Sequence, residues 1–178
     1  MTLNANPYLS ALRKFRRKRV RFVLVGVFGI NHYAPAPGAA YSTLDCDILV
    51  EPSPENLLKA LKALESGGYI LESNGEPLGK PDAWLAARIV RAKAAVTAIK
   101  DSAQIDLLTA VAGYSFAKLY AGKRLFRAGG TSVPVANLAH LLGMKKICGR
   151  KKDLEFLRLY RARMASLKIN RKRDDKRK

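Results

Sequence analysis

The feature that most constrains this chain is a pair of aspartates, Asp45 and Asp47, placed directly before the apolar residues 48–50. Side chains at positions i and i+2 leave the same face of a β-strand, so the two carboxylates should point the same way, about 7 Å apart. Two such carboxylates can bind one or two Mg²⁺ ions, which also bind nucleotide phosphates. The alternative is that both acids are solvated at a strand end, as in most pairs of this kind. The segment therefore predicts a core strand and a candidate metal site.

Composition favours a globular protein. A chain of 178 residues with 48% hydrophobic residues can form one domain with a small helical appendage. Two cysteines make neither a disulfide framework nor a zinc pattern, so we expect a reduced, cytoplasmic protein without a membrane span or signal peptide. Cys46 should face the core, opposite the two aspartates.

The charge of the chain points to a polyanionic partner. Thirty-three basic and 14 acidic residues give a net charge of +19, which attracts nucleic acids, nucleotides or anionic membrane surfaces. No acidic residue precedes Asp45, and residues 13–21 form a first basic cluster. Two further basic clusters lie at residues 145–163 and 168–178. The alternative is a solvated surface with a disordered tail. We favour nucleic acid, and the predicted binding residues are Arg13, Lys14, Arg16, Arg17, Lys18 and Arg19.

Hydrophobic periodicity predicts an α+β fold with a mixed sheet. The expected parts are a basic N-terminal helix or extension (1–20), a core (21–135), a C-terminal helical part (136–167) and a disordered basic tail (168–178). Strands are expected at 21–25, 43–50, 69–71 and 104–109, with a pair of short strands around Gly129-Gly130 in 124–135 and one or two more strands in 87–99. Helices are expected up to residue 19, from 27 to 33, from Ser53 to Gly67, and at 114–120, 134–147 and 152–167.

Two further positions extend the candidate site. Asp106 stands alone in the apolar run 104–109, where burial of a carboxylate is costly unless it is paired or bound to metal, so it is a candidate third ligand. Gly26 ends the first predicted strand, where backbone N–H groups at the start of a helix can bind phosphate. His32 follows it, and we interpret it as a packed or capping residue.

With these residues in place, residues 21–163 resemble the nucleotidyltransferase superfamily, in particular its minimal and toxin-type (AbiEii-like) bacterial members. Gly26 matches the start of the family's glycine motif, although Val27 stands where the family has Gly or Ser. Tyr41 stands where related sequences carry Arg. The remaining matches are Asp45 and Asp47 for the Asp-x-Asp, Asp106 for the third acid, and Lys145, Gly149, Arg150, Lys152 and Asp153 for the basic helix.

The resemblance implies a polymerase β-like fold with C-terminal helices and a nucleotidyl transfer from an NTP. Asp45, Asp47 and Asp106 would be catalytic and would hold two Mg²⁺ ions, with Asp106 assisting deprotonation of the acceptor. The expected acceptor is RNA, such as the 3′ end of tRNA, and a toxin role would add an antitoxin partner. The alternatives are AMP transfer to protein and a catalytically weak nucleic-acid-binding protein. Implied nucleotide-binding residues are Gly26, Val27, Thr43, Lys145, Arg150 and Lys152.

Overall fold

The computed structural model describes residues 7–175 and contains a mixed α+β fold, as the sequence predicts. The chain forms two compact units, one running to Leu141 and the other beginning at Leu142. The division falls inside helix α6 (Leu138–Cys148), a few residues after the boundary that we expected at 135/136. Each unit is described by itself below.

The first unit is built on one eight-stranded mixed sheet with the order β4-β3-β5-β6-β2-β1-β8-β7. Strand β2 lies near the middle, parallel to β6 and antiparallel to β1, so the Asp-x-Asp segment is placed among the most enclosed strands. The strands are β1 (Phe22–Leu24), β2 (Asp45–Val50), β3 (Ile70–Ser73), β4 (Glu76–Pro77), β5 (Val96–Lys100), β6 (Ala103–Leu108), β7 (Arg124–Ala128) and β8 (Thr131–Val135).

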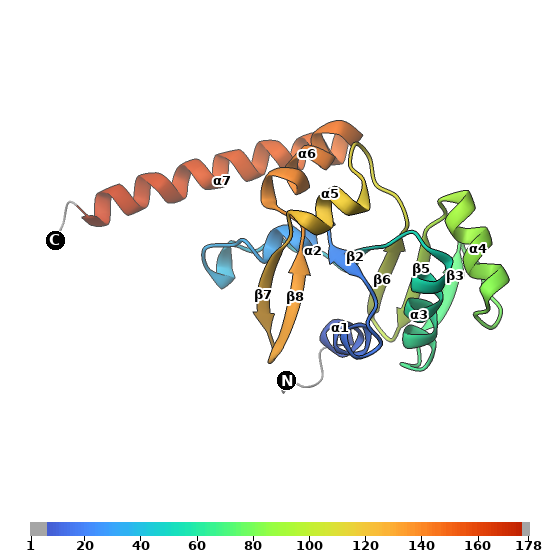
Figure 1. Ribbon diagram of the computed structural model, residues 1–178. Coiled ribbons are helices and arrows are strands. Elements are labelled where there is room, and N and C mark those ends of the chain that lie inside the picture. Colours follow the sequence, from blue (N-terminus) through green and yellow to red (C-terminus); the bar gives the residue numbers. More distant parts are fainter. Residues whose placement is uncertain (1–6, 176–178) are drawn as a thin grey trace. The chain divides into compact units, whose positions relative to one another are not determined.

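Helices of this unit pack against the sheet and against one another. Leu12 and Phe15 of the basic first helix are fully buried, while its Arg and Lys residues lie at its exposed or half-exposed positions. Helices α3 and α4 lie together beside β3 and β5 (Figure 1). The bounds are α1 (Pro7–Arg17), α2 (Gly26–Asn31), the short 3₁₀ turn η2 (Pro37–Ala39), α3 (Pro54–Glu65), α4 (Ala83–Ala92) and α5 (Phe116–Ala121).

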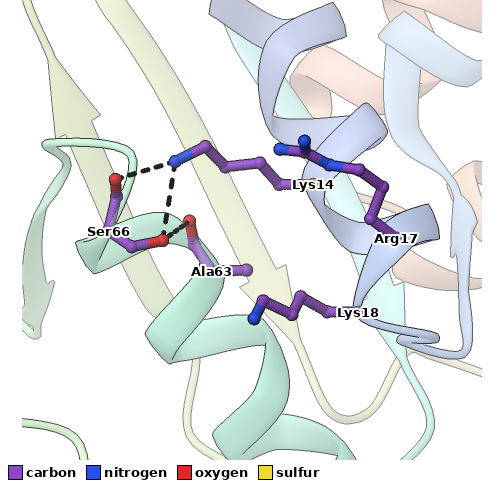
Figure 2. A pocket seen from close by; sticks show the side chains of 5 residues that line it. All are labelled: Lys14, Arg17, Lys18, Ala63 and Ser66. Atoms are coloured by element: carbon purple, nitrogen blue, oxygen red, sulfur yellow. Dashed lines mark hydrogen bonds between the residues drawn. The ribbon is translucent and has the colours of Figure 1, made fainter.

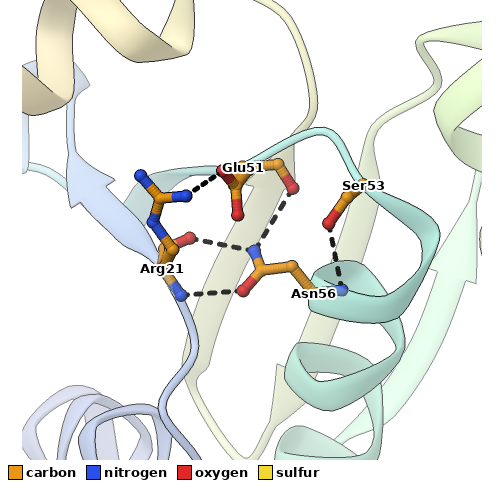
Figure 3. Close-up of polar contacts among 4 residues, drawn as sticks. All are labelled: Arg21, Glu51, Ser53 and Asn56. Carbon is orange, nitrogen blue, oxygen red and sulfur yellow. Dashed lines mark hydrogen bonds and ion pairs between the residues drawn. The ribbon is translucent and has the colours of Figure 1, made fainter.

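A buried asparagine joins β1, β2 and α3 (Figure 3). The side chain of Asn56, 5% exposed, accepts a hydrogen bond from the backbone N–H of Arg21 at 2.8 Å. It donates to the carbonyls of Arg21 at 3.0 Å and Glu51 at 3.2 Å. Ser53 caps the same helix by accepting from the Asn56 backbone N–H, as the Ser-Pro start predicts. Backbone groups at the ends of β1 and β2 are thereby satisfied.

The second unit contains the end of α6 and the long helix α7 (Lys151–Asp175). We expected α7 to end near Leu167 and a disordered tail to follow from Lys168, and this expectation was wrong as far as Asp175. Residues 151–175 contain neither Gly nor Pro, so nothing in the sequence stops the helix. Residues 176–178 lie outside the described part of the chain. Leu157 of α7 is buried, whereas Leu154 is 52% exposed.

Two other expectations need correction. Residues 87–92 are not a strand but the second half of α4, because Asp82 caps this helix by accepting from the Leu85 N–H at 2.8 Å. Buried Ala86 and Ile89 then follow at helical spacing. Pro134, expected to start a helix, lies in β8, and α6 begins only at Leu138. Within residues 7–175, no helix is both long enough and apolar enough to cross a membrane.

Candidate metal centre

Three carboxylates lie together on one face of the sheet. Asp45 and Asp47 alternate with buried Cys46 along β2, and Asp47 is directly opposite Asp106 on the parallel strand β6. One oxygen of each of the three aspartates lies within 4.8 Å of the others. All three side chains are half-buried. Oxygen donors at this density are the ligands that Mg²⁺ prefers, so the cluster fits a divalent cation.

Neighbouring side chains orient two of these carboxylates. The Gln104 amide donates to both oxygens of Asp106 at 3.2 Å, and the Thr97 hydroxyl donates to one of them at 2.9 Å. The hydroxyl of Thr43, which we predict to bind nucleotide, donates to a carboxylate oxygen of Asp45. These hydrogen bonds restrict the rotation of the two carboxylates.

Sequence reasoning missed Gln104 and Thr97, and only Gln104 had a signal that could be read from the sequence. Gln104 precedes Asp106 by two residues and therefore shares its face of β6. Thr97 pairs with Asp106 across β5 and β6, which requires knowledge of the strand register. A polar residue two positions before a strand aspartate is thus a readable sign of a supporting hydrogen bond.

Gly26 touches the acid cluster directly. Its φ of +62° lies in the left-handed region, and a Cβ at this position would stand 1.9 Å from Oδ2 of Asp47. Only glycine satisfies both conditions without displacing the carboxylate. The close approach to Asp47 is therefore a physical reason for glycine at position 26 that is independent of the predicted phosphate binding. Val27 follows it within α2 and is half-exposed.

The loop that leads into β2 is fastened to α2. The side-chain amide of Asn31 donates to the Tyr41 carbonyl and accepts from the Tyr41 N–H, both at 2.8 Å. His32 follows at the end of α2 and packs its ring against Phe28 and Phe126. Burial lowers the pKa of His32, which favours the neutral ring. This is the packed role that we expected, while Asn31 was not singled out.

Cys46 lies on the opposite face from the acids, as predicted, and is fully buried. Burial, and then the negative charges of Asp47, Asp45 and Asp106, raise the pKa of its thiol well above the ordinary value. Cys46 is therefore a packing residue and not a metal ligand, since metals bind the thiolate.

The basic motif of the second unit is organised around an internal acid. Asp153, 1% exposed, accepts from Lys145 at 3.0 Å and from Arg150 at 2.6 Å. Burial alone would raise the pKa of Asp153, but the hydrogen bonds and charges of Arg150 and Lys145 hold it below its ordinary value. Two of the three predicted phosphate ligands in this unit thus have a structural role, whereas Lys152 is exposed.

The six basic residues within 13–19 that we predict to bind nucleic acid have two kinds of surroundings. Arg13 donates to the Gly129 carbonyl in the β7–β8 turn, and Lys14 donates to the Ser66 carbonyl at the end of α3. The other four, Arg16, Arg17, Lys18 and Arg19, are exposed.

No protein-family model and no curated protein matches this chain.

Proposed function

We propose that this chain is a Mg²⁺-dependent nucleotidyltransferase, which moves a nucleoside monophosphate from an NTP to an acceptor hydroxyl. The supporting observation is the cluster of Asp45, Asp47 and Asp106, with oxygens from two neighbouring strands within 4.8 Å. The polymerase β-like fold is part of the same proposal, since a strand, a glycine and an Asp-x-Asp strand occur here in that family's order.

The residues present fit a divalent cation. Three carboxylates crowded at this distance repel one another strongly unless a cation neutralises them. Gly26 leaves room for the Asp47 carboxylate where any side chain would displace it. Asp45, Asp47 and Asp106 would hold up to two Mg²⁺ ions. Bound Mg²⁺ supplies positive charge that stabilises the charge developing on the transferred phosphoryl group.

Side chains of the protein would accept the proton and hold the catalytic carboxylates in position. A carboxylate oxygen of Asp106 accepts the proton of the attacking hydroxyl, while Gln104 and Thr97 keep that carboxylate in place. Thr43 fixes the Asp45 carboxylate in the same way. The acceptor oxygen then attacks the α-phosphorus as pyrophosphate leaves.

RNA is the proposed acceptor, because the net charge is +19 and four basic side chains at the end of α1 are exposed. A toxin paired with an antitoxin is the biological role that this chemistry would suit. The alternatives are AMP transfer to a protein hydroxyl and a nucleic-acid-binding protein without chemistry.

The test supplies the purified protein with Mg²⁺, total cellular RNA and each NTP in turn, labelled at the α-phosphate. Label should enter RNA with a preferred NTP, and the same NTP labelled at the γ-phosphate should transfer none. Asp45→Asn/Asp47→Asn should abolish the reaction. Asp101→Asn, a matched change at an exposed aspartate of the β5–β6 turn, should leave it unchanged.

The other outcomes separate the alternatives. Label on protein would favour AMP transfer. Absence of label from every acceptor, with RNA binding unchanged in Asp45→Asn/Asp47→Asn, would contradict the enzyme and favour a binding protein.

A further inference from the structure

A hollow of about 330 Å³ lies between α1 and the end of α3 in the first unit. Its lining consists of Lys14, Arg17 and Lys18 together with Ala63 and Ser66. Figure 2 shows the three basic side chains extending from the α1 segment toward the end of α3. The hollow is therefore lined mainly by basic side chains between two helices and is not a gap in the apolar core.

One of its cations is fixed by the fold. The Lys14 ammonium donates to the Ser66 carbonyl at 2.7 Å and lies 3.5 Å from the Ser66 hydroxyl oxygen. Lys100 donates to the next carbonyl, that of Gly67, at 2.8 Å. The C-terminal end of a helix ordinarily repels anions, and these two lysines neutralise that end of α3. Lys14 keeps further N–H donors for a ligand.

The other two cations remain available. Arg17 and Lys18 are exposed, and no carboxylate pairs with either of them within the described part of the chain. A guanidinium and two ammonium groups that line a small hollow are suited to a phosphate group, because the guanidinium binds two oxygens at once and the ammoniums add point charges. The volume suits one phosphodiester unit.

Helix α1 lies on the face of the sheet opposite the acid cluster. The ring of Phe15 lies 5.5 Å from that of Phe22, which pairs with Val50 on the same face of β2 as Cys46. The hollow is therefore a contact separate from the acids, although the first turn of α1 approaches their strand where the Tyr8 hydroxyl donates at 2.7 Å to the Leu44 carbonyl.

We propose that the hollow formed by Lys14, Arg17 and Lys18 binds a backbone phosphodiester of a single-stranded RNA. The proposal rests on RNA as the acceptor in the proposed function. Lys14, Arg17 and Lys18 then contact phosphate, whereas Arg13 has a structural role through its hydrogen bond to the Gly129 carbonyl.

The test measures binding alone, in EDTA and without NTP, so that it is independent of catalysis. A fluorescent single-stranded RNA of 12 nucleotides is titrated with the protein over a range of salt concentrations. Arg17→Ala/Lys18→Ala should weaken binding at least tenfold and lower the slope of log K against log salt by about 1, since up to two phosphate contacts are lost. Lys80→Ala/Arg91→Ala removes two exposed charges elsewhere in the unit and is the matched control.

A shorter RNA and lipid vesicles distinguish RNA phosphate from phosphate of other sources. A trinucleotide should also bind Arg17→Ala/Lys18→Ala more weakly than the wild type, because the hollow contacts a single phosphodiester. The proposal is overturned if both double variants lose RNA affinity equally, or if Arg17→Ala/Lys18→Ala loses binding only to phosphatidylserine vesicles or inorganic phosphate. Loss of RNA binding in a protein that transfers no nucleotide would uphold the hollow and contradict the proposed function alone.

Discussion

At the scale of single residues, the three carboxylates oppose folding until a cation joins them. Asp47→Asn should therefore stabilise the protein in EDTA, by about 1 kcal/mol, because it relieves like-charge repulsion within 4.8 Å. In Mg²⁺ the order should reverse, since an ion bound only by the folded wild type adds about 2.7 kcal/mol at 100 times its Kd.

Chemical unfolding of both proteins, with and without Mg²⁺, measures this reversal. Asp101→Asn is the control and should not respond to Mg²⁺ differently from the wild type. A variant less stable than the wild type under both conditions would contradict a metal centre held by Asp47.

Gly26 permits a second prediction at this scale. Gly26→Ala places a Cβ 1.9 Å from Asp47 Oδ2 and must also occupy a φ of +62°. The left-handed backbone should cost about 1–2 kcal/mol, and displacement of the carboxylate should reduce Mn²⁺ affinity measured by calorimetry at least tenfold.

The matched control is Gly75→Ala. Gly75 has a φ of +80° with no atom within 4 Å of an added Cβ, so this variant should lose similar stability and keep the wild-type Mn²⁺ affinity. Equal Mn²⁺ affinities in the two variants would show that the contact with Asp47 is unimportant.

At the scale of elements, Asn56 is the connection between α3 and two strands. Asn56→Ala leaves the backbone N–H of Arg21 without its partner and removes one of the two hydrogen bonds accepted by each of the Arg21 and Glu51 carbonyls. It should lower the free energy of unfolding by about 2 kcal/mol. Ser53→Ala removes only the helix cap and should cost about 1 kcal/mol. Urea unfolding ranks the two, and a larger loss for Ser53→Ala would contradict this role of Asn56.

Asp153 is the corresponding connection between α6 and α7. Its pKa is lowered in the folded state, so its ion pairs stabilise the fold above the ordinary carboxylate pKa and are lost as the pH falls through the lowered value. Asp153→Asn should cost about 2 kcal/mol at pH 7, and the difference from wild type should shrink toward pH 3. Exposed Glu155→Gln is the control on the same helix and should show no such difference in unfolding experiments.

The sequence predicted elements well where local signals agreed with the final packing. The Asp-x-Asp strand, the Ser53 cap and the β7–β8 hairpin were found because alternation, capping and paired glycines are local. Helix α4 was misjudged since the β-branched residues Ile89 and Val90 obscured the cap at Asp82. The grouping of Asp106 with Asp45 and Asp47 was inferred, whereas the register that opposes it to Asp47 arises from nonlocal pairing of β2 with β6.

At the scale of the whole molecule, charge should dominate the encounter with RNA. A net charge of +19 attracts any strand through released counterions, so non-specific affinity should fall steeply with salt. If six phosphates are contacted, we expect roughly a thousandfold loss between 50 and 200 mM salt by electrophoretic mobility shift. A nearly flat salt dependence would show that charge does not drive binding, whereas the unrelated variant Ser53→Ala should follow the wild type.

The two cysteines allow the opening of the sheet to be measured, because one is exposed and the other is buried. Cys148 is exposed at the end of α6, and Cys46 is enclosed in the middle of the sheet with its thiolate disfavoured. An alkylating reagent should therefore modify Cys148 at once and Cys46 only during the moments when the central strands separate. The rate of Cys46 modification therefore measures how often these strands separate. A lower rate in Mg²⁺ or RNA would show that the ligand stabilises the strands that carry the three aspartates.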